Sequence, residues 1–183
     1  KEEELKGLSR EVIAAAADND SIVIQDDINL IILSSEISTS KSLRINGQGA
    51  TLQVTEPKVS AYRPLEFVSP SSDPLVIINV ALYNLTLIGG DISAASTTQE
   101  KNGGALYVKR ASLKLVNCTL TGKAYSGGGL YSETSTTLYM DGCLIDSCVV
   151  THDLAGAVIG GFTGGFIIKN TTISNNDATA YGG

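Results

Sequence analysis

Short apolar runs separated by polar turns dominate the chain after residue 20. The runs IVI, LIIL, SLRI and TLQV follow one another between residues 22 and 54. Each is short, rich in branched aliphatic side chains and bounded by Gly, Asn, Asp or Ser, a pattern that is typical of β-strands. This part of the sequence therefore predicts a succession of short strands joined by tight turns.

Residues 2–18, EEELKGLSREVIAAAAD, show a different period. Their apolar residues fall at helical spacing: Leu5, Leu8, Val12, Ile13 and Ala16. Glu2, Glu3 and Glu4 would lie at the positive end of the helix dipole. We therefore expect one helix over 2–18, and we divide the chain into a capping helix (1–20) and a β-structured part (21–183).

The β-structured part contains an internal repeat. Four segments align without gaps: NLTLIGG (84–90), NCTLTGK (117–123), GCLIDSC (142–148) and NTTISNN (170–176). Their starts are 33, 25 and 28 residues apart, and SLRINGQ (42–48) is a weaker copy. Between the later copies lie the glycine-rich segments NGGAL, SGGGL and LAGAV.

A unit of this length, with three short strands and no helix, predicts one coil of a right-handed parallel β-helix, an all-β fold here closed by an N-terminal capping α-helix. A propeller or sandwich with Gly-rich turns is the alternative. In a β-helix, equivalent residues of successive coils stack at the strand spacing of roughly 4.8 Å. The repeat predicts three inward columns: Ile45, Leu87, Leu120, Ile145 and Ile173; Leu85, Cys118, Cys143 and Thr171; Leu82, Leu115, Met140 and Ile168.

Asn84, Asn117 and Asn170 occupy one turn position of the repeat. Asn tolerates the left-handed conformation, and stacked amides can form a ladder. Each also begins an N-x-T sequon, so the three are glycosylation candidates if the protein is secreted by a eukaryote. The pattern favours a turn residue that needs no glycan.

Cys118 and Cys143 share one slot in successive coils. Stacked strands would place their Cα atoms within disulfide range, but parallel Cβ vectors fit the required torsion poorly. The slot also holds Leu85 and Thr171, so we expect two buried thiols in contact and no disulfide. Cys148 falls in a polar turn slot and is expected to be accessible.

The composition argues against several partners. The net charge is −6, which disfavours nucleic acid and anionic lipid. No apolar run is long enough to span a bilayer, so we expect no membrane insertion by this segment. Three cysteines are too few for a disulfide scaffold or a zinc site. The chain begins and ends abruptly, which suggests a piece of a longer protein whose β-helix continues beyond an uncapped C-terminal coil.

No catalytic, cofactor-binding or metal-binding set is evident. Asp141 and Asp146 flank a turn, and His152 is a lone histidine expected in solvent. Arg63 lies in the longest insertion, 55–74, which we expect to protrude and to shape a groove. The sequence therefore favours a role without catalysis and without a cofactor.

Tyr107 and Tyr131 follow the glycine pairs at the same place in two coils. They are expected to stack on each other. Such a column could be ordinary packing within the sheet, or it could offer a flat face to sugars or to a partner protein.

Two parts of the sequence resemble a known group. The opening, LSREVIAAAADNDSIVIQDD followed by SKSLRINGQGATLQV, looks like the start of pectate-lyase-like surface proteins. The later coils are similar to the repeats of chlamydial polymorphic outer-membrane proteins, which carry F-x-x-N followed by G-G-A-I/L/V. NGGAL matches the second motif, SGGGL and LAGAV each depart by one residue, and the segment 173–176, ISNN, has Ile in place of Phe.

The resemblance implies an extracellular or cell-surface protein. The expected function is a non-enzymatic structural or adhesive module of a larger protein, with a protein or a glycan of the cell surface as its partner. One rival is a polysaccharide lyase or glycoside hydrolase of the same fold, since fold alone does not decide activity. Another is a building block of an extracellular filament that stacks end to end through the uncapped coil.

Overall fold

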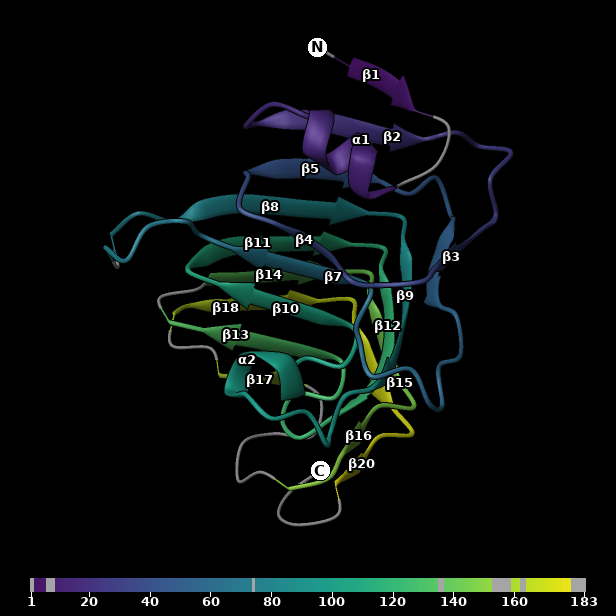
Figure 1. Cartoon of the computed structure of the whole chain (residues 1–183), viewed down its shortest axis with the longest axis vertical. Helices are drawn as coiled ribbons and strands as arrows, with labels where there is room; N and C mark the ends of the chain where they lie inside the picture. The colour runs from purple at the N-terminus through teal and green to yellow at the C-terminus, as the bar shows by residue number, and fades with distance from the viewer. Residues whose placement is uncertain are drawn as a thin grey trace.

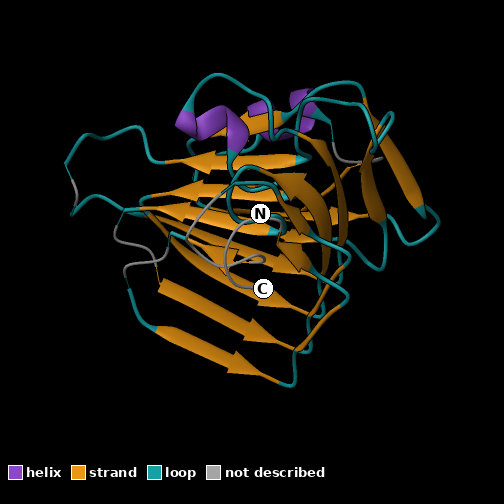
Figure 2. Cartoon of the chain, turned by 90° about the horizontal axis from the view of Figure 1, so that it is seen from below, coloured by secondary structure: helices purple, strands orange, loops and turns teal. Residues whose placement is uncertain are grey.

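The chain winds into a right-handed parallel β-helix (Figure 1). The computed structural model describes residues 2–5, 9–73, 75–134, 137–152, 159–161 and 164–178 of the 183. Each coil adds one strand to each of three sheets, and all strand pairs are parallel. Figure 2 shows the sheets from below, and buried apolar side chains fill the space between them. The expected fold class is confirmed, and a propeller and a sandwich are excluded.

The three sheets contain the following strands in spatial order. Sheet A consists of β1 (Glu2–Leu5), β2 (Asp20–Ile24), β5 (Leu43–Asn46), β8 (Ile78–Tyr83), β11 (Ala111–Val116), β14 (Thr137–Asp141) and β18 (Phe166–Lys169). Sheet B consists of β3 (Leu30–Leu33), β6 (Thr51–Val54), β9 (Thr86–Asp91), β12 (Thr119–Ala124), β15 (Leu144–Asp146) with β16 (Val149–Val150), and β19 (Thr172–Ser174) with β20 (Asp177–Ala178). Sheet C consists of β4 (Ile37–Thr39), β7 (Leu65–Val68), β10 (Leu106–Lys109), β13 (Leu130–Glu133) and β17 (Ile159–Gly160).

Columns of stacked aliphatic side chains fill the core, because alternate residues of every strand point inward. The sheet A column is Ile22, Ile45, Leu82, Leu115, Met140 and Ile168. The sheet B column is Ile31, Leu52, Leu87, Leu120, Ile145 and Ile173. Two of the predicted columns are therefore present, but the place given to Ile45 is wrong: it stacks on Leu82 in sheet A, and Leu52 holds the sheet B slot.

The strands furthest along the chain carry exposed apolar side chains. Ile173 is 49% exposed, and Phe166 and Ile168 are also partly open to solvent. The prediction that Ile173 is buried is wrong, although it stacks on Ile145 as expected. The reason is geometric: within the described residues no strand lies beyond β18 or β19, so these side chains have a neighbour on one side only.

The N-terminal end is closed by a short helix and a strand. Helix α1 spans Arg10–Ala15, has Ser9 as its N-cap and packs against β4. Its Ile13, together with Ala16 just after it, enters the core. The predicted helix over 2–18 is therefore too long, because Glu2–Leu5 pair with β2 as strand β1. Gly7 disfavours a helix interior, and β2 offers an open edge to the preceding residues.

Asparagines in the left-handed conformation make the turn between sheets A and B. Asn84, Asn117 and Asn170 have φ of 49°, 51° and 47°. The Asn117 side chain donates to Asn84 Oδ1 (3.2 Å), and Asn84 donates to Asn46 Oδ1 (3.1 Å). The predicted turn and amide ladder are present, and at one coil Gly142 (φ 64°) takes the Asn position.

The glycine pairs serve the turn into sheet C. Gly103 and Gly127 have positive φ, and a Cβ on Gly104 would lie 2.3 Å from the carbonyl oxygen of Gly128. The pairs are required because successive coils approach closely here and the chain needs a left-handed residue. All of LAGAV (154–158) lies outside the described residues.

Candidate functional site

Several buried polar side chains lie on or over the outer face of sheet C, among them Glu66, Arg63 and Asn102. Its outward column is Ser38, Glu66, Tyr107, Tyr131 and Gly160, one residue from each of β4, β7, β10, β13 and β17. Glu66 is only 5% exposed, and Tyr107 is fully buried although it points away from the core. The segments that cover this face come from the connections between sheets B and C.

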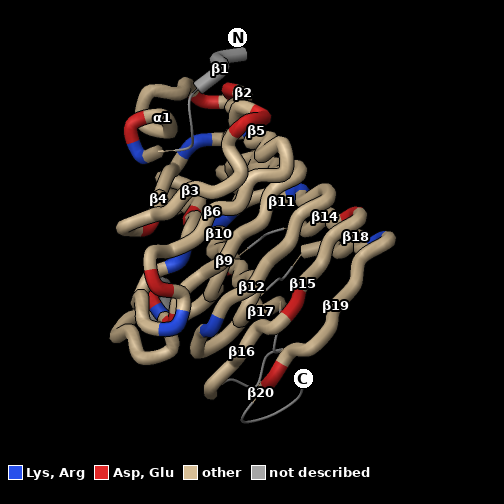
Figure 3. The backbone as a smooth tube through the Cα atoms, turned by 90° about the vertical axis from the view of Figure 1, so that its right-hand side faces the viewer, with Lys and Arg blue, Asp and Glu red and all other residues tan. Residues whose placement is uncertain are grey.

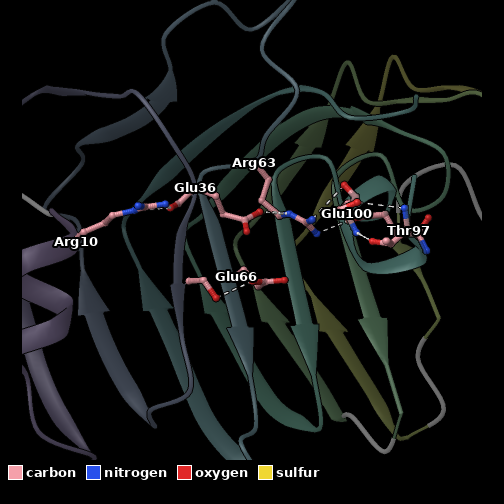
Figure 4. Close-up of polar contacts among 8 residues, drawn as sticks. Arg10, Glu36, Arg63, Glu66, Thr97 and Glu100 are labelled. Carbon is pink, nitrogen blue, oxygen red and sulfur yellow. Dashed lines mark hydrogen bonds and ion pairs between the residues drawn. The ribbon is translucent and has the colours of Figure 1, made fainter. Parts of the chain in front are cut away.

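Arg63 is the centre of this cluster (Figure 4). Its side chain pairs through Nε with Glu36 Oε2, donates through Nη1 to the Asn102 carbonyl oxygen (2.6 Å) and through Nη2 to that of Glu100 (3.2 Å). The guanidinium also lies 5.0 Å from the ring centre of Tyr107. Arg63 is 2% exposed, so the expectation that it protrudes in a solvent loop is wrong.

Helix α2 (Thr98–Lys101) presents its backbone to Arg63. Thr97 and Glu100 form a capping box, which fixes the start of this short helix. The carbonyl groups of Glu100 and Asn102, near its end, carry partial negative charge and receive the guanidinium. Arg63 therefore fastens the 97–102 segment onto sheet C.

A second carboxyl group, that of Glu66, lies beside the Glu36 carboxylate that pairs with Arg63. Burial raises the pKa of Glu36, the nearby charge of Glu66 adds to the rise, and Arg63 opposes it. Glu66 accepts a hydrogen bond from Ser38 Oγ at 2.6 Å. Glu36 and Glu66 are thus two neighbouring carboxyl groups of which one is biased toward its protonated form.

Tyr107 continues the network toward the next coil. Its hydroxyl donates to Glu133 Oε2, and its ring stacks on Tyr131 with centroids 6.0 Å apart and planes 7° apart. Burial, and then the hydrogen bond to Glu133, raise the pKa of Tyr107 far above its usual range. Burial alone would raise the pKa of Glu133, but hydrogen bonds from Lys109 and Tyr107 together hold it below its ordinary value. The tyrosine pair is therefore packed, and its Tyr107 face is not available to a ligand.

An open groove of about 890 Å³ borders the cluster. Arg10, Lys41, Ser38 and Glu66 line it, together with apolar atoms of Val68 and Pro70. Lys41 Nζ donates to three carbonyl oxygens at the end of α1, and Arg10 donates to the Glu36 carbonyl oxygen. The carboxyl group of Glu66 is the one acidic group that lines this groove.

Two carboxyl groups beside a groove are the residue types that glycoside hydrolysis uses as acid and base. Arg63, however, pairs with Glu36 and is itself buried. The arrangement therefore supports a structural role for Arg63, which fastens the 97–102 segment to sheet C. Only Glu66 is placed so that it could take part in acid–base chemistry. Sequence reasoning missed Glu36 and Glu66 because they lie in different coils, and only the register of β4 and β7 brings them together.

The predicted site residues lie elsewhere. Cys118 and Cys143 are buried free thiols on the opposite side of the core, at the turn between sheets A and B. Cys148 is also fully buried, so its predicted accessibility is wrong. Each of Asn84, Asn117 and Asn170 uses its side-chain nitrogen as a donor within the turn ladder, and their glycosylation stays a prediction.

The remaining predictions concern His152, metal binding and membrane insertion. His152 is exposed and stacks on Tyr125, with ring centroids 4.8 Å apart. Within the described part of the chain, no three His, Cys, Asp or Glu side chains are grouped so that they could hold a metal ion. None of the described helices has the length and hydrophobicity needed to cross a membrane.

Comparison of the chain with models of protein families, with curated proteins and with solved structures yields no match.

Proposed function

We propose that this chain is a non-enzymatic structural module of a larger extracellular or cell-surface protein. One observation carries this proposal: aliphatic columns run without interruption from β2 to β15, while the cations nearest the sheet C groove are bound to internal acceptors. These residues bind the coils to one another, so the body is stiff. Its outer faces and loops are then the parts that partners can contact.

We expect the same geometry to make the module resistant to force and to proteolysis. Each strand between the ends is hydrogen-bonded to two neighbours, so a coil cannot leave without breaking pairs on both sides. Charged residues are few and scattered along the strands (Figure 3). An extended body of this kind suits a surface module of the type that its repeats resemble.

Limited proteolysis tests the structural part of this proposal. With a protease of broad specificity we expect early cuts only in the connections, chiefly 55–62 and 69–77, with the strand core persisting. Rapid degradation throughout β5 to β15 would contradict a rigid module. Surface labelling of intact cells that make the parent protein tests its location. A protein that is labelled only after the cells are lysed would overturn the extracellular assignment.

A hydrolase or lyase is the second candidate, favoured by Glu66 at the edge of the groove with Glu36 beside it. Release of reducing sugar, or absorbance of an unsaturated product, would be measured on a panel of polysaccharides with wild type and Glu66→Gln. Product formation by wild type that Glu66→Gln abolishes would replace the structural proposal. Lys58→Gln, on an exposed loop away from the groove, is the control variant.

A filament unit is the third candidate, favoured by the exposed apolar residues Phe166, Ile168 and Ile173. Sedimentation velocity over a range of concentrations tests it. End-to-end assembly predicts growing species that Ile168→Glu suppresses, whereas one size at all concentrations would exclude assembly through this end.

A further inference from the structure

Three exposed cations lie on the outer face of sheet A, on alternate strands: Arg44 on β5, Lys114 on β11 and Lys169 on β18. Among the side chains that the structure describes, no carboxylate forms an ion pair with any of the three. Elsewhere, Arg63, Lys109 and Lys123 pair with Glu36, Glu133 and Asp91. In an acidic protein, a face that carries cations without ion-pair partners favours the binding of an anionic partner.

The register of the sheet sets the spacing of these charges. Arg44 and Lys114 are both aligned with Ala81, one on each side, so they lie two strands apart in one column. Two strand spacings are about 10 Å. Tyr139 follows Lys114 in the same column, and the Lys114 ammonium lies 5.3 Å from its ring centre and 5.6 Å from that of Tyr83.

A continuous trough follows this column along the axis of the β-helix. It consists of two shallow hollows of about 450 and 420 Å³ that share Ser112 and Lys114. Hydroxyl and amide groups line it, among them Ser21, Asn79 and Thr137, and the tyrosine side chains of positions 83 and 139 add aromatic surface. No described carboxylate lines either hollow.

Asp141 is the one carboxylate at an outward position of strands β2 to β18 in this sheet. Its two oxygens already accept from the Tyr139 hydroxyl (3.0 Å) and from Asn170 Nδ2 (2.9 Å). Lys169, which is aligned with Asp141 on β18, and Lys114 also interact electrostatically with this carboxylate, which does not line the trough.

We propose that this trough binds a linear acidic polysaccharide that lies along the axis, with one anionic group at Arg44 and another at Lys114. Two consecutive sugars of an extended chain span about the distance between these cations, so one charge per disaccharide fits. The hydroxyl and amide lining suits sugar hydroxyls, and the half-buried rings of Tyr83 and Tyr139 suit the C–H faces of sugars. Duplex DNA carries a charge about every 1.7 Å, which is far denser than this row of cations.

The inference deepens the proposed function, because it names a ligand class for a surface module. It uses a different face from the sheet C groove, and it rests on the extracellular location only for the biological source of the ligand. A failed binding experiment would leave the rigid module intact, and rapid proteolysis would leave the binding result standing.

The experiment is isothermal titration calorimetry of the full chain at low salt with a short hyaluronan oligosaccharide, which carries one carboxylate per disaccharide. A chitin oligosaccharide of equal length is the neutral control, and polyglutamate and single-stranded DNA are the competing polyanions. We expect hyaluronan to bind and the other three to bind at least about tenfold more weakly, with affinity falling as salt is added. Absence of hyaluronan binding, or equal binding of chitin, polyglutamate or DNA, overturns the proposal.

Variants assign the binding to the trough. Arg44→Gln combined with Lys114→Gln is expected to weaken hyaluronan binding about tenfold or more, because both anchoring charges are lost. Both side chains are exposed, so the variant should keep the wild-type melting temperature. Lys58→Gln removes an exposed cation from a loop outside the trough and should change the affinity less than twofold. An equal loss in the Lys58 variant would show that only net charge matters and would overturn the assignment.

Discussion

Leu120 lies between Leu87 and Ile145 in the sheet B column and has no exposed surface. Truncating a leucine in such a place removes apolar contacts and leaves a cavity that a stacked strand cannot close. We therefore expect Leu120→Ala to lower the free energy of unfolding by about 2–5 kcal/mol, measured by urea denaturation. Ile173→Ala, in the same column but half exposed, is the control and should lose clearly less. Equal losses, or a loss near zero at Leu120, would contradict the column.

The three cysteines allow a second prediction. Cys118 and Cys143 are neighbours in one column, and their hydrogen bond raises the pKa of Cys118 and lowers that of Cys143 to about 7. Burial raises the pKa of Cys148 to about 12. Because all three are buried, we expect no rapid reaction with a thiol reagent in the native protein and three reactive thiols after denaturation without reductant. A single thiol after denaturation would mean that Cys118 and Cys143 are bonded.

Cys148 also shows where reasoning from sequence failed at this scale. The gapless repeat aligned it with Lys123, but the structure aligns Lys123 with Val149, because Ser147 (φ 53°) adds one residue between β15 and β16. A shift by one residue moves a side chain to the other face of a strand. The repeat itself marked the apolar columns of β9, β12 and β15 correctly, since buried side chains there recur at fixed positions.

At the scale of the elements, the turn between β11 and β12 allows the contribution of backbone conformation to stability to be measured separately from that of side-chain hydrogen bonding. Asn117 needs a positive φ and donates to Asn84, whereas Gly142 holds the equivalent place without a side chain. Asn117→Ala is expected to lower the unfolding free energy by about 1–2 kcal/mol, because alanine is strained in this conformation. Asn117→Gly keeps the conformation and loses only the amide, so it should cost less. If the two variants lose the same stability in urea denaturation, the amide ladder and not the backbone is what matters.

The N-terminal cap leads to a prediction about association. Removing residues 1–18 takes away β1 and α1, uncovers the edge of β2 and removes Ile13 and Ala16 from the core. We expect the shortened protein to melt about 5 °C or more below the full chain and to associate in sedimentation velocity. Removing residues 1–5 alone keeps α1 and should have the smaller effect on melting. A shortened protein that stays monomeric with unchanged melting would show that these elements do not cap the fold.

The N-terminal cap and the sheet C cluster show how far these elements could be predicted from the sequence. Helical spacing correctly placed apolar residues of α1 at the end of the core, but it could not show that Glu2–Leu5 prefer the open edge of β2. Arg63 and Glu36 come from irregular connections that the repeat does not describe. Their meeting depends on the path of those connections, which only the folded structure fixes.

For the molecule as a whole, stability is distributed along one axis. An inner coil is held by neighbours on two sides, and its contacts with them far exceed those with distant coils. The described C-terminal strands β18 and β19 pair on one side only, with β14 and β15. We therefore expect unfolding to begin at this end and to proceed inward. The alternative is a single cooperative transition of the entire structure.

Native-state hydrogen exchange measures this order directly. We expect amides of β18 and β19 to exchange at least about tenfold faster than those of β8 and β11, because opening the end breaks half as many strand pairs. The measurement is made at a concentration where sedimentation shows a monomer, since association through Phe166 and Ile168 would protect these amides. Leu120→Ala should accelerate exchange in the neighbouring inner strands as well, which distinguishes a weakened column from ordinary fraying. Uniform protection from β2 to β19 would contradict the one-dimensional account and indicate a fully cooperative domain.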